Sequence, residues 1–183
     1  MMMFLRRRSS TAQTAKAKTP DELSPASLKT DPPEKPSPEK GPLLPLVPPA
    51  QKLSRAEANS RSMLALAHVG DAVYELLVRG SLIAGSTAGV NELHRHTVSR
   101  VRAESQAEAA RLLQPKLTEE EKEIYRRGRN CRVHGVPAHA SPGDYHAATG
   151  LEALFGWLYL IGETDRIEEL FRSIQEESHG PVS

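Results

Sequence analysis

The 183-residue chain is short of cysteine, of long apolar runs and of net charge, and each shortage excludes a class of protein. A single cysteine, Cys131, excludes an intramolecular disulfide framework and a zinc site built from cysteines. The longest nearly apolar run, Leu151–Gly162, contains Glu152 and is too short to span a bilayer, so no membrane partner is expected. A formal net charge of +1 excludes a uniformly basic protein that coats nucleic acid.

Proline is scarce in most of the chain, because ten of its 14 prolines lie in the first 50 residues. The start of this segment, Met1–Pro20, is basic and free of acids, which is typical of a disordered tail or of an organelle transit peptide. The stretch Pro32–Pro49 predicts an extended linker that stands off the domain, since proline withholds backbone donors. We therefore expect an arm over residues 1–53, a folded domain over residues 54–178 and a tail over residues 179–183.

Beyond residue 62 the apolar residues recur every three or four positions, and no strand-like alternation persists. This spacing predicts helices over residues 62–85, 90–113, 118–128 and 144–161, and a fifth that begins at residue 164 and includes residue 174. Thr118 and Glu121 form a capping box at the start of the third helix. Residues 130–142 contain Gly135 and Pro137 and are expected to form a loop. Five helices and no strand indicate an all-α bundle.

Two carboxylates lie in unusually apolar, glycine-rich surroundings. Asp71 directly follows Gly70, and Glu152 lies between Gly150 and Gly156. Glycines inside helices allow two backbones to approach closely, and a charge in such a place is costly unless it is paired or binds a metal. Carboxylates from two helices could hold Mg²⁺, which needs only one or two of them when phosphate supplies other ligands. The alternative interpretation is that both acids are exposed positions or members of ion pairs.

Four segments, in this order along the chain, resemble motifs of a known family. Leu66–Glu75 is similar to the signature helix of the ribonuclease III family, and Leu151–Leu160 is similar to its second acidic helix. Asn91–Arg95 and Arg126–Asn130 narrow the resemblance to Mini-ribonuclease III, the group that has the catalytic domain without a double-stranded-RNA-binding domain. The resemblance implies the helical fold of the ribonuclease III endonuclease domain, preceded here by a disordered N-terminal arm.

The resemblance also implies roles for particular residues. Asp71 and Glu152 would be the catalytic residues and the ligands of Mg²⁺, for which Mn²⁺ could substitute, and Glu75 would support them. Full-length ribonuclease III has two further acids, at the positions of Ala67 and Thr149 in this chain. Mini-ribonuclease III shares this reduced set, which implies weaker metal binding.

Basic residues close to these motifs are candidates for RNA contact. Lys122, Arg126 and Arg129 are four and three residues apart and so share one helix face, although a charge run is usually only a solvated face. With the motif residues they make up the set that we expect to contact RNA: His94, Arg95, Lys122, Arg126, Arg127, Arg129, Asn130 and Arg132. For His94 a structural role is the alternative.

The resemblance implies a Mg²⁺-dependent endoribonuclease that cuts double-stranded RNA and leaves 5′-phosphate and 3′-hydroxyl ends. A homodimer would place one site on each strand. The implied substrate is the 23S ribosomal RNA precursor in a bacterial cytoplasm, with a ribosomal protein as a candidate helper, or in a chloroplast if the arm is a transit peptide. Two rival hypotheses are a non-catalytic ribonuclease III fold that binds RNA in ribosome assembly or intron splicing, and a helical protein–protein module.

Overall fold

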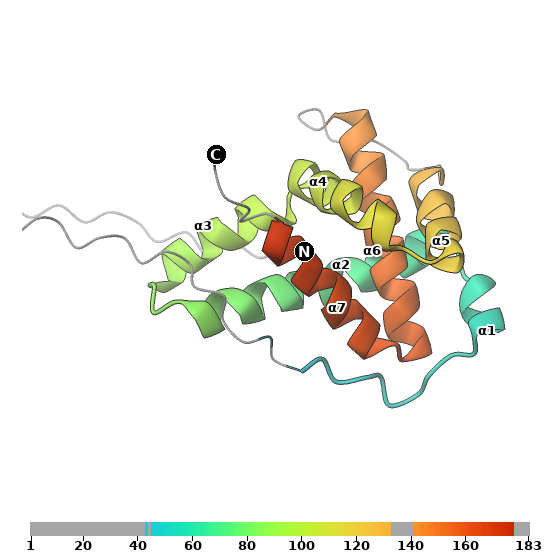
Figure 1. Ribbon diagram of the computed structural model, residues 1–183, viewed down its shortest axis with the longest axis horizontal. Coiled ribbons are helices and arrows are strands. Elements are labelled where there is room, and N and C mark those ends of the chain that lie inside the picture. The colour runs from blue at the N-terminus through green and yellow to red at the C-terminus, as the bar shows by residue number, and fades with distance from the viewer. Residues whose placement is uncertain (1–42, 44, 133–140, 178–183) are drawn as a thin grey trace, which may run out of the picture. The chain divides into compact units, whose positions relative to one another are not determined.

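A computed structural model describes residues 43, 45–132 and 141–177 of the chain (Figure 1). In this part the chain forms helices and no strand, which confirms the predicted all-α bundle. The elements are α1 (Arg55–Asn59), α2 (Met63–Gly85), α3 (Val90–Val101), α4 (Ala103–Leu113), a 3₁₀ turn η1 (Gln114–Lys116), α5 (Glu119–Arg129), α6 (Pro142–Ile161) and α7 (Thr164–Glu177). Within the described residues, no helix is long and apolar enough to cross a membrane. Most of the predicted arm, loop residues 133–140 and the tail lie outside the described residues.

Helix α6 is the centre of the bundle and packs against α2, α4, α5 and α7 (Figure 1). It is apolar around most of its circumference, and a helix of that kind has to be surrounded by other elements. Its Trp157 and Phe155 are fully buried. The ring of Tyr74 on α2 lies edge-on to Phe155 and to Phe171 of α7, with centroid distances of 5.6 and 5.7 Å. These contacts fix α2 and α7 against the central helix.

The predicted capping box at the start of α5 is present, and it extends into a buried ion pair. The Thr118 side chain accepts a hydrogen bond from the Glu121 backbone N–H, and the Glu121 carboxylate accepts one from the Thr118 backbone N–H. The same carboxylate accepts hydrogen bonds from Arg166 of α7 at 2.9 and 3.0 Å. Burial raises the pKa of Glu121, but the hydrogen bonds from Arg166 and Thr118 outweigh it and leave the pKa below its usual value. This pair ties α5 to α7.

The single helix predicted over residues 90–113 is wrong, because the chain breaks at Arg102. Arg102 has φ −68° and ψ 154°, which is extended backbone, and α3 and α4 lie on either side of it. The break changes the helical phase. Val98 on α3 is 50% exposed, whereas Gln106 on α4 is buried. The Ser105 side chain bonds across the break to the Ser99 carbonyl oxygen at 2.7 Å.

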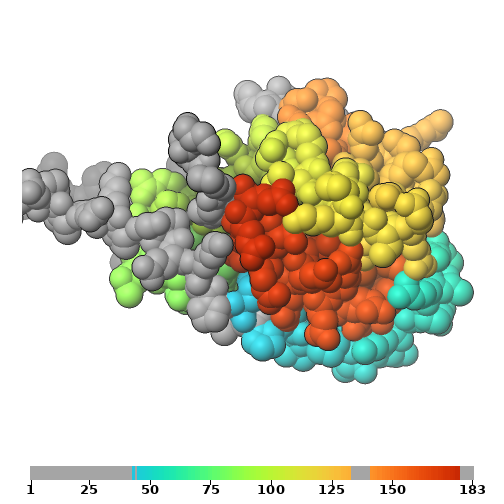
Figure 2. Space-filling view, viewed as in Figure 1, coloured from blue at the N-terminus to red at the C-terminus, as the bar shows by residue number. Residues whose placement is uncertain are grey.

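The predicted linker does not stand off the domain in the part that the structure describes, so that prediction is wrong for residues 45–49. Leu46 is only 8% exposed, and its N–H donates to the carboxylate of Glu168 on α7 at 2.6 Å. Further on, the Leu53 N–H donates to the Leu160 carbonyl oxygen at 2.8 Å. Figure 2 shows this segment running along the surface beside α7. Apolar residues between the prolines thus fasten the segment to the bundle.

The short helix α1, which periodicity did not predict, is held by its last residue. Asn59 accepts a hydrogen bond on its side chain from the Trp157 indole N–H at 2.8 Å. Its backbone carbonyl accepts one from the Arg127 guanidinium at 3.2 Å. Asn59 therefore joins α1 to both α5 and α6.

Candidate active site

Helices α2 and α6 cross with their backbones in close contact, and glycine makes this possible. A Cβ atom on Gly70 would overlap the carbonyl oxygen of Glu152 and lie 2.7 Å from the backbone nitrogen of Gly156. A Cβ atom on Gly156 would overlap the Leu66 carbonyl oxygen and lie 2.9 Å from the Gly70 nitrogen. Backbone atoms cannot give way as a flexible side chain can. The close approach predicted from these glycines is therefore confirmed.

This crossing brings the two candidate catalytic acids to one cleft. Asp71 follows the contact glycine of α2, and Glu152 supplies the facing carbonyl of α6, so both side chains leave the backbone at the crossing. Both line a cleft of about 540 Å³ between α2, α6 and the junction of α3 and α4. The other polar side chains on its wall are His68, Arg102, Glu104, Gln106, Tyr145 and Thr149.

The pKa values of both candidate acids are raised. Burial, followed by the negative charge of Asp71, raises the pKa of Glu152 from 4.5 to about 7, against a hydrogen bond from Gln106 that lowers it. Partial burial and the charge of Glu75 raise the pKa of Asp71, and His68 opposes them. The raised pKa values mean that no neighbouring positive charge offsets the burial of either carboxylate. Oxygen ligands of this kind fit a hard divalent cation.

The positions where full-length ribonuclease III carries further acids supply no carboxylate. Ala67 is buried, and the Thr149 hydroxyl donates to the Tyr145 carbonyl oxygen at 3.0 Å. Among the described residues, no group of three or more His, Cys, Asp or Glu side chains comes together as a metal site. Glu75, the expected supporting acid, accepts a hydrogen bond from Arg79 at 3.0 Å, one turn further along α2. Its effect on Asp71 is therefore one of charge.

The basic residues of α5 are partly neutralised within their own helix. Lys122 pairs with Glu119 at 2.7 Å, and Arg126 forms two hydrogen bonds with Glu123 at 2.8 and 2.9 Å. Arg127 turns inward to the Asn59 carbonyl described above. The remaining members at this end of the helix, Arg129, Asn130 and Arg132, are exposed. Their RNA contacts stay a prediction.

The other predicted RNA contacts lie on a different part of the bundle. His94 and Arg95 are exposed on α3, where the Arg95 guanidinium lies 3.8 Å from the Glu92 carboxylate. Figure 1 shows α3 and α5 at opposite ends of the bundle. The predicted set is therefore divided into two groups of positive charge, one on each side of the central helix.

Arg102 and Gln106 are cleft residues that were not among the predicted site residues. Arg102 is the extended residue at the helix break, and its guanidinium donates to Ser105 at 3.2 Å. Gln106 lies one turn further and is buried. A signal for Gln106 was present, because Gln106, Ala110 and Leu113 follow helical spacing and all three are buried. The break at Arg102 had no glycine or proline to announce it.

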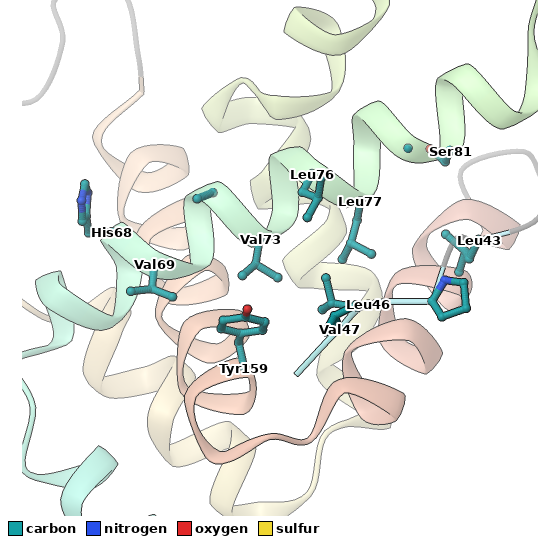
Figure 3. Close-up of a pocket in the computed structure, with 13 residues that line it drawn as sticks. Leu43, Leu46, Val47, His68, Val69, Val73, Leu76, Leu77, Ser81 and Tyr159 are labelled. Carbon is teal, nitrogen blue, oxygen red and sulfur yellow. The ribbon is translucent and has the colours of Figure 1, made fainter. Parts of the chain in front are cut away.

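A second hollow, an apolar groove of about 660 Å³, runs along the opposite side of α2 (Figure 3). Figure 3 shows Val69, Val73 and Leu77 of α2 pointing into it, with Tyr159 of α6 below them and Leu46 closing one side. Leu76 on its edge is 58% exposed. The groove therefore leaves apolar side chains of α2 open to solvent.

Comparison with known proteins agrees with this geometry. A model of the ribonuclease III domain matches residues 64–163. Mini-ribonuclease 3 of Symbiobacterium thermophilum is 46% identical over 110 residues, which cover 60% of this chain and 85% of that protein. Mini-ribonuclease 3 of Thermosynechococcus vestitus is 42% identical over 132 residues, which cover 72% and 82%. A crystal structure of a protein from Fusobacterium nucleatum superposes with a TM-score of 0.61 at 26% identity, covering 67% of this chain and 98% of that one.

The helical bundle with its facing acids is thus a nuclease domain of the ribonuclease III type. The chain belongs to the ribonuclease III family and, within it, to the Mini-ribonuclease III group of endoribonucleases. The family acts on double-stranded RNA and generally depends on a divalent metal. The predicted family and enzyme class are confirmed.

Proposed function

We propose that this chain is a Mg²⁺-dependent endoribonuclease whose active site is the cleft between α2 and α6. One observation carries the proposal: the glycine crossing holds Asp71 and Glu152 on the wall of the same cleft. If Asp71 and Glu152 were simply exposed surface acids, their helices would not require the close backbone contact that only glycine permits. The retention of both acids also favours catalysis over a non-catalytic RNA-binding role.

The residues of the cleft have separate tasks in the reaction. Asp71 and Glu152 would hold Mg²⁺, which when bound polarises the scissile phosphate and lowers the pKa of water. Glu152 has to give up its proton before it can act as a ligand, since its pKa is raised to about 7. The rigid crossing sets the separation of the two acids before substrate arrives, so little of the binding energy is needed to order them. The products would carry 5′-phosphate and 3′-hydroxyl ends.

RNA binding would use positive charge on both sides of the cleft. Arg102 lies on the cleft wall itself, where it can reach a phosphate next to the one that is cut. Arg129 and Arg132 at the end of α5 would contact the backbone further along the duplex. Because Lys122 and Arg126 already pair with glutamates, each would have to exchange its partner for a phosphate.

A homodimer would follow from the apolar groove on α2. Leu76 and Ile83 of α2 are 58% and 64% exposed, and Leu76 lies on the edge of the groove. A two-fold pairing across this groove would cover it and place two clefts on one assembly. Each strand of an RNA duplex would then meet its own site.

For the biological substrate we propose the 23S ribosomal RNA precursor, with a ribosomal protein as a candidate helper. The bacterial and cyanobacterial relatives support the cytoplasm of a bacterium as the location. A chloroplast is the alternative if the basic segment Met1–Pro20 is a transit peptide.

The test replaces single acids in the full chain and measures cleavage of a duplex RNA with Mg²⁺ or with EDTA. Asp71→Asn and Glu152→Gln keep side-chain shape and remove the charge that would hold the metal, so both should abolish cleavage while the helical content is unchanged. Asp144→Asn is the matched control, because Asp144 is an acid on the same helix that pairs with Arg111 at 3.5 Å. Cleavage by Asp71→Asn at the wild-type rate would reject the assignment of the site.

A further inference from the structure

The amide of Gln106 is buried at the active-site cleft without a full set of hydrogen bonds. Gln106 lies on α4 and is 1% exposed, although its side chain forms part of the cleft wall. Among the described residues, its Oε1 is one of two buried side-chain polar atoms that have no hydrogen-bond partner, the other being Nδ1 of His146. A buried amide in this condition destabilises the fold, so its presence calls for a reason other than stability.

The amide nitrogen of Gln106 does have a partner, which is the candidate metal ligand Glu152. The Gln106 side chain lines the same cleft as Glu152, and hydrogen bonding from it lowers the pKa of that carboxyl. A carboxylate can only accept when it is ionised, so the amide nitrogen must be the donor. Glu152 comes from α6 and Gln106 from α4, and these two helices pack against each other. One amide therefore contacts the acid with its nitrogen and leaves its oxygen for another donor.

Neither the residues that stand in place of the missing acids nor Asp71 can orient Glu152. Ala67 and Thr149 provide no charge, and the Thr149 hydroxyl is committed to the Tyr145 carbonyl oxygen. Asp71 repels Glu152 and cannot orient it by a hydrogen bond while both are ionised. Of the two side chains that act on the pKa of Glu152, Asp71 does so by charge and Gln106 by a hydrogen bond.

We propose that Gln106 is a positioning residue of the metal site, which holds the Glu152 carboxylate with its amide nitrogen. This rests on the proposed function, because it assumes that Glu152 is a metal ligand. Outer groups of this kind orient ligands and are needed for affinity. This chain has Ala67 and Thr149 where full-length ribonuclease III has acids, so the Gln106 amide helps to hold the metal site in their place.

The test is Gln106→Met, which keeps the length and flexibility of the side chain and removes both polar atoms. Mg²⁺ binding is measured by calorimetry on the full chain without RNA, and cleavage of duplex RNA is measured across a Mg²⁺ series. We expect Mg²⁺ affinity to fall between about 10-fold and 100-fold. The midpoint of the Mg²⁺ series should rise by the same factor, while the rate at saturating Mg²⁺ stays close to that of the wild type.

A matched control separates positioning from packing. Gln114→Met changes the same residue type two turns further along, where the amide donates to the Ala110 carbonyl oxygen at 3.4 Å, and should leave Mg²⁺ affinity unchanged. The thermal midpoint of Gln106→Met should equal or exceed that of the wild type, because an unpartnered buried oxygen is removed. A variant that unfolds, or that keeps Mg²⁺ affinity within twofold of the wild type, overturns the proposal.

A double-variant cycle tests whether Gln106 acts through Glu152. In the Glu152→Gln background the further change Gln106→Met should alter Mg²⁺ affinity by less than twofold, since the ligand that it positions is already gone. An undiminished effect in that background would overturn the proposal. Since metal binding is measured without RNA, a wild-type chain that binds Mg²⁺ but cuts no duplex would reject the proposed activity and leave the Gln106 result readable.

Discussion

Gly70→Ala is the substitution that most directly tests how this fold makes its active site. The added methyl group would overlap the Glu152 carbonyl oxygen and come within 2.7 Å of the Gly156 nitrogen, well inside ordinary van der Waals contact. Neither neighbour is a side chain that could rotate away. The two helices must therefore move apart or tilt, by a displacement on the order of 1 Å.

Gly70→Ala should lower both the free energy of unfolding and the rate of RNA cleavage. Overpacking a rigid core costs about 1–3 kcal/mol, and a backbone-to-backbone clash belongs at the upper end, so we expect the free energy of unfolding to fall by about 3 kcal/mol. Because the atom that is struck belongs to Glu152 itself, the displacement passes directly to the acid. A misplacement of about 1 Å in an active site can slow a reaction roughly 100-fold, and we expect a loss of that order.

Gly80→Ala is the matched control on the same helix. Nothing lies within 4 Å of a Cβ atom at Gly80, so the change should stabilise the protein by about 0.5–1 kcal/mol through the lower backbone entropy of alanine. Urea unfolding at one fixed protein concentration gives both energies, and single-turnover cleavage of a duplex RNA gives the rate. If Gly70→Ala unfolds and cleaves like Gly80→Ala, the crossing does not position the acids.

Three further outcomes are expected. Without metal, the free energy of unfolding should fall by up to about 3 kcal/mol as the pH rises from 4.5 to about 7, because the folded state holds the Glu152 proton more tightly than the unfolded state does. Urea titrations at a series of pH values measure this dependence, and Glu152→Gln should remove most of it. Deleting residues 1–42 should leave cleavage unchanged. Deleting residues 1–50 should in addition lower the free energy of unfolding by about 2 kcal/mol, because the buried side chain of Leu46 is lost. Equal thermal midpoints for the two truncated chains would contradict this. Arg129→Ala should flatten the plot of log affinity against log salt by about 0.7–0.9, whereas the control Arg172→Ala on α7 should not.

The parts of the fold that could be predicted were those with a strong local signal. The acids of α2 and α6 were recognisable because the segments that carry them resemble the two acidic helices of the ribonuclease III family. The start of α5 was fixed by Thr118 and Glu121, which form the same capping box in the structure. In both cases the residues that decide the outcome are neighbours in sequence.

The missed parts depend on contacts between distant residues. Arg102 interrupts a helical pattern without glycine or proline, and its extended backbone is compensated by Ser105 and Ser99 across the break. The proline-rich segment met the criteria for a free linker, but Glu168, more than a hundred residues away, accepts its Leu46 N–H. Helix α1 is too short for periodicity, although Ser54 and Glu57 form a capping box that could have indicated it.

The glycine crossing also decides the order in which the bundle should come apart. Local openings begin where few buried contacts hold the backbone, as in α3, where Thr97 is the only fully buried residue. The amides of α2 and α6 around Gly70 and Gly156 lie in the densest part of the core and should exchange their hydrogens only on global unfolding. Partial openings would then leave Asp71 and Glu152 in register, so the enzyme should retain its cleavage chemistry on warming until the whole bundle melts.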